Sequence, residues 1–92
     1  MVEDAIVVED ADNVATAVRD LPLGSIIQLS ISGRKRQVKL VQAIPFGHKF
    51  ALRRIPRGGA VVKYGEVIGV AMEDIEAGGH VHIHNVRSNR GR

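Results

Sequence analysis

Four turns of the same form recur along this chain and restrict it to short, closely spaced strands. Each has an apolar residue, two variable residues and a glycine, at residues 21–24 (LPLG), 44–47 (IPFG), 55–58 (IPRG) and 75–78 (IEAG). A β-prone run follows each one, and proline and glycine at such positions set tight turns. The pattern predicts a buried anchor, a turn and a new strand at every repeat. The whole chain, 1–92, is therefore expected to form one mostly-β domain that is strongly bent.

Strands can be placed from side-chain periodicity. A first strand is expected over residues 5–8. Two further strands, over 26–31 and 37–41, flank a hairpin turn at 32–35 that contains a glycine. The basic residues at about 87–92 are expected to form a polar C-terminal tail.

One short α-helix is expected over about 12–20. Asp12 and Asn13 are residue types that cap helix N-termini. Apolar side chains then recur at i, i+3, i+4 and i+7, and proline and glycine follow where the helix would end. The four apolar residues are Val14, Ala17, Val18 and Leu21. The sequence thus predicts a mostly-β fold with one short N-terminal helix.

Charge is distributed unevenly and indicates an anionic partner. Residues 1–12 carry five acidic side chains and no basic one, whereas residues 21–92 carry twelve Lys or Arg against four acids. Such a cationic body suits a small anionic substrate, an acidic protein or nucleic acid. Nucleic acid is disfavoured, because Phe46, Phe50 and Tyr64 are the only aromatic side chains and none alternates with basic residues.

Composition narrows the class of protein further. There is no cysteine, which excludes a disulfide framework and a thiolate metal cluster. The acidic N-terminus lacks the basic and apolar regions of a signal peptide. No apolar run approaches the roughly 20 residues that span a bilayer. A cytoplasmic protein without membrane contact is expected.

Three of the four histidines alternate along one stretch, at His80, His82 and His84. On a strand they project to one side, with neighbours on that side about 6.6 Å apart. A His-x-His pair can chelate one ion, whereas His80 and His84 would lie roughly 13 Å apart. At most two of the three could share an ion, and further ligands would come from elsewhere. The alternative is a solvated polar face on an edge strand.

Two other short stretches carry residue types suited to chemistry. His48 and Lys49 follow a Pro/Gly turn, where an acid or base could lie beside an ammonium group that binds anions. Lys63 and Tyr64 precede Gly65 and could bind a carboxylate or transfer a proton. Exposed turns with polar residues explain both stretches equally well. No complete active site is visible in the composition or the spacing.

Taken in order, several motifs resemble a known family. Residues 44–52 (IPFGHKFAL), 62–69 (VKYGEVIG) and 80–85 (HVHIHN) resemble the SAF domain of the altronate and galactarate dehydratases. Residues 12–18 (DNVATAV) resemble the first helix of that family. The domain also occurs as a separate small subunit, and such subunits serve sulfolactate sulfo-lyase as well. The large catalytic domain of the full-length dehydratases has no counterpart in these 92 residues.

The resemblance implies a β-clip fold and a function. The expected reaction is the elimination of water from a sugar acid to give a 2-keto-3-deoxy acid. The chain would act as a small subunit beside a large catalytic subunit, with iron(II) or manganese(II) as the metal. The alternatives are a small subunit of sulfolactate sulfo-lyase, a subunit that only assists assembly, and a stand-alone sugar-acid-binding module. Assembly of the chain into a homo-oligomer stays open.

The resemblance also assigns roles to residues of the three motifs. His48, His82 and His84 are the expected catalytic residues, and His82 with His84 would contribute to a metal site shared with the partner subunit. Lys49 and Lys63 would bind the substrate carboxylate. Tyr64 and Asn85 would complete substrate binding with hydrogen bonds.

Overall fold

The structure is a computed structural model that describes residues 4–7, 9–31 and 33–88. These residues form antiparallel strands in three sheets, so the mostly-β prediction is confirmed. The strands are β1 (Ala5–Ile6), β2 (Val14–Ala17), β3 (Ile26–Ile31), β4 (Arg34–Lys39), β5 (Lys49–Ala51), β6 (Ala60–Lys63), β7 (Glu66–Ala71), β8 (His80–Val81) and β9 (Val86–Ser88).

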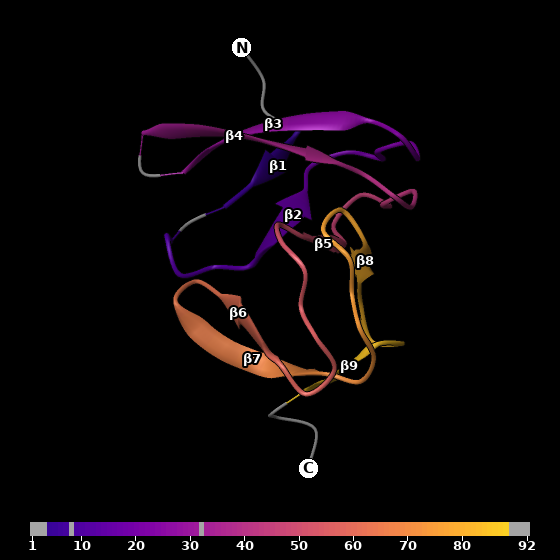
Figure 1. Ribbon diagram of the computed structural model, residues 1–92. Coiled ribbons are helices and arrows are strands. Elements are labelled where there is room, and N and C mark those ends of the chain that lie inside the picture. The colour runs from indigo at the N-terminus through magenta and orange to yellow at the C-terminus, as the bar shows by residue number, and fades with distance from the viewer. Residues whose placement is uncertain (1–3, 8, 32, 89–92) are drawn as a thin grey trace.

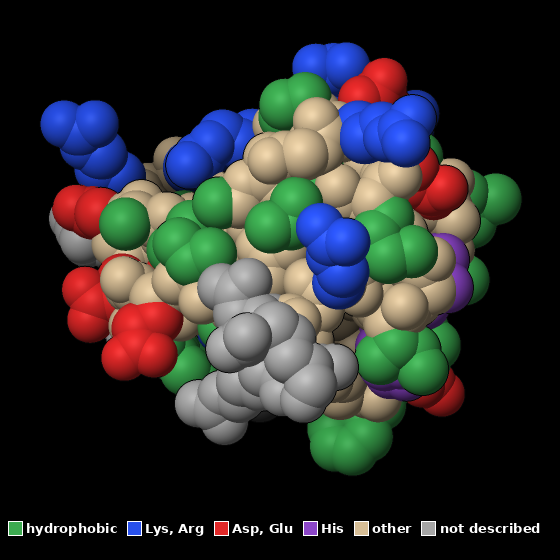
Figure 2. Space-filling view, turned by 90° about the horizontal axis from the view of Figure 1, so that it is seen from below, with side chains coloured by type: hydrophobic (Ala, Val, Ile, Leu, Met, Phe, Trp, Pro, Cys, Tyr) green, Lys and Arg blue, Asp and Glu red, His purple; other side chains and the backbone are tan. Residues whose placement is uncertain are grey.

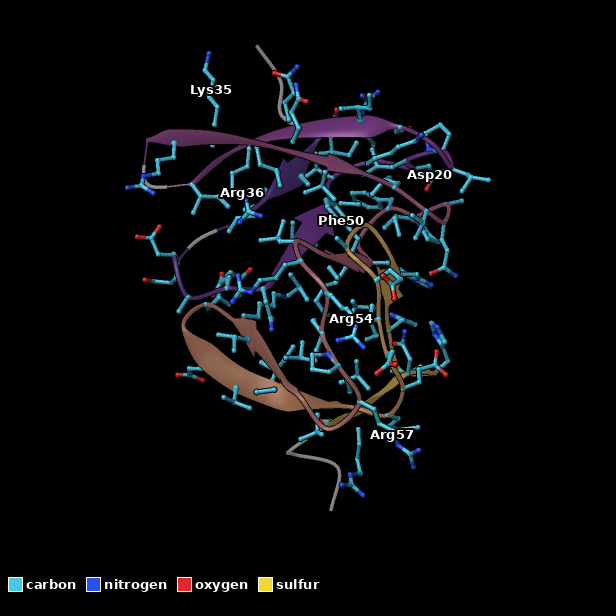
Figure 3. All side chains as sticks on the ribbon, viewed as in Figure 1. Asp20, Lys35, Arg36, Phe50, Arg54 and Arg57 are labelled. Carbon is cyan, nitrogen blue, oxygen red and sulfur yellow. The ribbon has the colours of Figure 1, made fainter. Side chains whose placement is uncertain are left out.

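The three sheets lie one above another (Figure 1). The β3–β4 hairpin covers one side of a four-stranded sheet in the order β1-β2-β5-β8, and the three-stranded sheet β6-β7-β9 covers the other. Two hydrophobic cores fill the spaces between these layers. Phe50 is fully buried in the first core and lies near the middle of the molecule (Figure 3). The central sheet is therefore buried on both faces.

Burial on both faces explains why the predicted helix is wrong. Residues 14–17 form β2, the second strand of the central sheet, and the described residues contain no helix. Val14 packs in the second core, whereas Ala15 and Ala17 pack in the first. A strand that is buried on both faces has apolar residues at nearly every position. In a run this short, that pattern overlaps with the helical spacing.

The two presumed cap residues instead hold a distant hairpin. The Asn13 side chain accepts a hydrogen bond from the backbone N–H of Val62 (2.8 Å) and donates to the carbonyl of Ala60 (2.8 Å). Asp12 accepts a hydrogen bond from the N–H of Gly65 (2.8 Å). Both side chains are buried. They connect the central sheet to β6 and to the turn that follows it.

The four repeated turns have one backbone conformation. Their glycines have φ between 82° and 86°, and in each turn the N–H after the glycine donates to the carbonyl two residues before it. This is a type II turn, which requires a residue with positive φ at its third position. The anchors are buried and pair reciprocally, Leu21 with Ile44 and Ile55 with Ile75. The predicted anchor-and-turn repeat is confirmed.

The predicted hairpin is also confirmed, with small differences in extent. Six residue pairs form the ladder, from Ile31 with Arg34 next to the turn to Ile26 with Lys39. The first strand covers Ala5–Ile6, and Val8 lies outside the described residues. Of the polar tail predicted at about 87–92, residues 87 and 88 belong to β9 (Val86–Ser88), which pairs with β7. Residues 89–92 lie outside the described residues.

Candidate active site

The pairing of β5 with β8 brings two histidine-bearing segments together. Phe50 is opposite His80 and Lys49 is opposite Val81 in the antiparallel register. The next pair along the two chains is His48 and His82. Their rings stack with centroids 3.8 Å apart and planes inclined by 11°, as expected for side chains that face one another across two strands.

His80 joins the same cluster. Its Nε2 atom lies 2.8 Å from Nδ1 of His48, within hydrogen-bond distance. The ring centroids of these two residues are 5.0 Å apart, and that of His80 is 5.5 Å from that of His82. One ring nitrogen from each of His48, His80 and His82 can be chosen so that all three lie within 4.8 Å of one another. All three side chains are partly buried.

The straight strand expected through the alternating histidines is wrong. β8 ends at Val81, and residues 82–85 form a turn in which the N–H of Asn85 donates to the carbonyl of His82 (3.1 Å). The turn brings the ring of His84 to 5.0 Å from that of His80, instead of the roughly 13 Å expected on a straight strand. His84 is exposed at the edge of the cluster.

The buried side chain of Asn85 stabilises this turn by hydrogen bonds to its backbone. Its side chain is 4% exposed, donates to the carbonyl of His80 (2.7 Å) and accepts from the N–H of His82 (2.9 Å). Gln42 adds a third bond, since its side-chain oxygen accepts from the N–H of His80 (2.9 Å). These contacts hold the backbone of both histidines. Asn85 therefore positions the cluster from beneath and does not face solvent.

His82 lines an open groove of about 570 Å³. Its charged lining residues are Lys49, Lys63 and Glu66, and its apolar lining comes from Ile68, Val81, Ile83 and Val86, with Tyr64 and Ser88 completing it. Lys49 and Lys63 therefore share a groove with one of the clustered histidines. The histidine side chains reach the surface at one edge of the face shown in Figure 2.

The two lysines are close enough to influence each other. Burial, followed by the positive charge of Lys63, lowers the pKa of Lys49. An anion in the groove would offset the repulsion between the two ammonium groups. The electrostatics of the groove thus favour a negatively charged occupant.

Tyr64 holds an unusual backbone conformation at the rim of this groove. Its φ is +56°, and with Gly65 (φ +75°) it forms the two-residue turn between β6 and β7. Bulky residues rarely adopt positive φ, and such outliers are often found at functional sites. The bond from the N–H of Gly65 to Asp12 supports the turn. The ammonium of Lys63 lies 4.8 Å from the centroid of the Tyr64 ring, which orients both side chains.

The histidines influence one another electrostatically. Burial, then the neighbouring His84, His48, His82 and Lys49, lowers the pKa of His80. The pKa of His82 is lowered by burial and by His48, Lys49 and His84. Lowered pKa values favour neutral imidazoles, which is the form that accepts a proton or binds a metal ion.

The cluster has the donor chemistry of a metal site. Its donors are three imidazole nitrogens, and no carboxylate of the described residues belongs to the group. Imidazole suits iron, zinc, copper and nickel, whereas manganese prefers carboxylate and water. Of the two metals that the resemblance implies, these residues therefore fit iron(II) better.

Comparison with known proteins identifies the family. The family described as the altronate/galactarate dehydratase SAF domain matches residues 3–89. The chain belongs to this family. It is 49% identical to the altronate dehydratase of Escherichia coli over 85% of its length, and 40% identical to that of Bacillus subtilis over 91%. It is 35% identical to the (2R)-sulfolactate sulfo-lyase subunit alpha of Chromohalobacter salexigens, again over 91%.

The relatives differ greatly in length. The chain spans 15% and 16% of the two altronate dehydratases but 94% of the sulfo-lyase subunit alpha. By name, all three are dehydratases or sulfo-lyases, so the SAF-domain family serves lyases. No helix among the described residues is long and apolar enough to cross a membrane.

Sequence reasoning missed some residues of the site and found others. His80 was missed because the resemblance assigned the metal pair to His82 and His84, and strand spacing allowed only two of the three histidines to share an ion. The bend at residues 82–85 has no glycine or proline to signal it. Asp12, Asn13 and Gln42 were missed because each bonds to backbone that is remote in sequence. His48, His82, Lys49, Lys63 and Tyr64 do lie at one edge of the molecule, around the groove and the cluster.

Proposed function

We propose that this chain is the small subunit of a lyase that eliminates water from an anionic sugar acid, and that its groove forms one wall of a site completed by a large catalytic subunit. One observation carries the proposal: two lysines and a histidine of a three-histidine cluster line the same open groove. A carboxylate in the groove would lie between cations and beside groups that transfer protons or hold a metal ion.

The family membership supports a lyase, and the relatives' lengths support a separate subunit. The altronate dehydratases carry several times more chain than is present here, and the sulfo-lyase subunit alpha has nearly the same extent. The openness of the site agrees with this division. A groove open to solvent lacks the walls that exclude water from a reaction, and a second polypeptide would supply them.

The chemistry required of the site is simple to state. A base removes the proton on the carbon next to the carboxylate, the hydroxyl on the following carbon leaves as water with a proton from an acid, and the enol becomes a 2-keto-3-deoxy acid. Lys49 and Lys63 would bind the carboxylate, whose negative charge increases as the proton leaves. A divalent metal, when bound, would stabilise that same charge.

The remaining residues are given supporting roles. His48, His82 and His84 would form the wall that moves the proton or holds the metal ion. Tyr64 would donate a hydrogen bond from the rim, since its side chain is 57% exposed. Asn85 would act as a positioning residue through the backbone of His80 and His82.

Sulfolactate is the second candidate substrate. The near-complete coverage of the sulfo-lyase subunit alpha favours it, and so does the pair of lysines in one groove. Sulfolactate carries both a carboxylate and a sulfonate, and two ammonium groups suit two anionic groups. Altronate carries a single carboxylate and would offer one anionic group to the two ammonium groups.

The proposal is tested by reconstitution. The chain is co-purified with a large dehydratase-like subunit co-expressed with it, and altronate, galactarate and sulfolactate are assayed for 2-keto acid or sulfite release. Lys49→Ala and Lys63→Ala are each expected to raise KM about tenfold, because a hydrogen bond to a charged group contributes about 1.5–3 kcal/mol. Lys35→Ala is the matched control, since Lys35 is exposed and points away from the body of the molecule (Figure 3).

Three results would contradict the proposal. Full turnover by the large subunit without this chain would leave it no part in catalysis. Binding of sugar acid by this chain alone, with no effect on any large subunit, would make it a binding module. Equal activity of the Lys49→Ala and Lys35→Ala complexes would show that the groove is not part of the active site.

A further inference from the structure

We propose that His48, His80 and His82 bind one divalent transition-metal ion on this chain alone, without ligands from a partner. The metal site lies within the proposed active site, so its role in catalysis rests on the proposed function. Its test uses the isolated chain, so the two can fail separately. It differs from the sequence-based expectation in placing His80, and not His84, among the ligands.

The distances between the ring nitrogens are close to those around a bound ion. Three nitrogens bound at 2.0–2.1 Å in a tetrahedral site lie roughly 3.3 Å from one another. Here Nδ1 of His48 and Nε2 of His80 are 2.8 Å apart, and the whole set lies within 4.8 Å. Because the three rings stack nearly parallel, each would have to turn about its Cβ–Cγ bond before the nitrogen lone pairs converge on one ion. An ion would also replace the close nitrogen–nitrogen contact with bonds to both atoms.

The backbone of the three ligands is already fixed. The register of β5 with β8 sets His48 against His82, and Asn85 and Gln42 bond the main chain of His80 and His82. Histidines whose backbone is fixed lose less conformational freedom when an ion binds. This preorganisation distinguishes the cluster from histidines that happen to be close on a mobile loop.

The ligand set indicates the class of ion. Three neutral nitrogens, with no carboxylate of the described residues in the group, suit zinc, nickel, cobalt, copper and iron(II). Magnesium and calcium take oxygen ligands and are expected to bind weakly. Affinity should rise from iron(II) through cobalt and nickel to copper.

An ion held this way would retain its double positive charge and an open coordination position. His82 lines the groove with Lys49 and Lys63, so a carboxylate or hydroxyl of the groove's occupant could supply the next ligand. Three histidines with one open position are the arrangement of catalytic rather than structural zinc sites. Proton transfer would then fall to His84 or to a group of the large subunit, because a metal-bound imidazole nitrogen accepts no proton.

The experiment uses the full chain without a histidine tag. Zinc and nickel are titrated by calorimetry, and cobalt by visible absorption, which reports nitrogen ligation and geometry. One ion per chain is expected. His48→Ala, His80→Ala and His82→Ala should each weaken binding at least about tenfold, since loss of even an outer-sphere partner weakens metal sites 10–100-fold. His84→Ala should change the affinity by less than threefold.

A second measurement does not depend on variants that fold. In the wild-type chain, zinc should shift the NMR signals of the three ligand imidazoles more than that of His84, which lies next to the cluster without binding the ion. Magnesium serves as the negative control. Absence of zinc, nickel and cobalt binding would overturn the proposal. So would one ion per two chains, or a His84→Ala variant as weak as His80→Ala.

Discussion

The turn at residues 44–47 and the turn at residues 55–58 have the same backbone and different chemistry. Their glycines have φ of 84° and 83°, and each donates its N–H to a carbonyl of a neighbouring strand, at 2.9 and 2.8 Å. The next residue is His48 after the first turn and Gly59 after the second. Only the first carries a side chain that reaches the cluster. The scaffold is thus repeated, whereas the chemistry is added at single positions.

The comparison separates two kinds of residue. Anchors and turn glycines recur in all four turns and serve the fold. His48, Lys49 and His80 stand where the other turns carry Ser25, Ile26, Gly59 and Ala60, so the fold does not require them. Substitutions of the first kind should affect stability, and substitutions of the second kind should affect binding.

The largest effect is expected at Gly78. A Cβ atom there would collide with the backbone of Lys39, and φ is +82°. At Gly58, φ is almost the same, +83°, but a Cβ would meet open space. Gly78→Ala should lower the free energy of unfolding by about 3 kcal/mol or more, and Gly58→Ala by about 1–2 kcal/mol. Urea denaturation of both variants measures the difference, and equal losses would show that the close approach is unimportant.

Substitutions of Asn13 distinguish its observed role, hydrogen bonding to the backbone of β6, from the helix cap expected from sequence. Asn13→Ala leaves backbone groups of β6 without partners and should destabilise the chain by about 2 kcal/mol. Asn13→Asp should also destabilise it, because a carboxylate cannot donate to the carbonyl of Ala60. Asp is as good a helix cap as Asn, so a cap would tolerate that change. An Asn13→Asp variant that is as stable as the wild type in thermal or urea unfolding would contradict the observed role.

Substitution of His48 tests whether metal binding can be lost without loss of stability. Because Gly59 occupies the equivalent position, His48→Ala should change the free energy of unfolding by no more than about 1 kcal/mol. Zinc affinity should nevertheless fall by at least about tenfold. Urea denaturation and calorimetry on the same sample measure both quantities. A strongly destabilised His48→Ala variant would show that the fold itself requires this histidine.

The smallest effect is expected at Asp74, which bonds the backbone N–H of Arg57 (2.9 Å) in the second pair of turns. That bond, and next the charge of Arg54, lower the pKa of Asp74 from its ordinary 3.8. A lowered folded-state pKa means that the contribution to stability is present above pH 3.8 and is lost as the pH falls through the lowered value.

Asp74→Asn should therefore be slightly less stable than the wild type near neutral pH, and the difference should shrink in acid. Thermal unfolding across this range measures it. Glu73→Gln is the matched control, since it removes the neighbouring exposed carboxylate. A difference between wild type and Asp74→Asn that stays constant down to the most acidic pH would contradict the assignment.

Much of the architecture could be read from local patterns. The apolar anchors and glycines predicted the four turns, because positive φ and burial are local requirements. Residues 26–31 were predicted to form a strand, which the structure confirms and shows to be buried on one face. The motifs that resemble the dehydratase family were also sufficient to identify the family.

Only the tertiary structure decided the identity of β2 and the membership of the histidine cluster. Residues 14–17 carry a pattern compatible with helix or strand, and their contacts with two separate cores select the strand. Likewise, alternation along a strand places His80 and His84 far apart, and the turn closed by Asn85 brings them together. His48 joins them through pairing across 32 residues of sequence. Local preference determined the four repeated turns, whereas long-range packing determined which side chains meet.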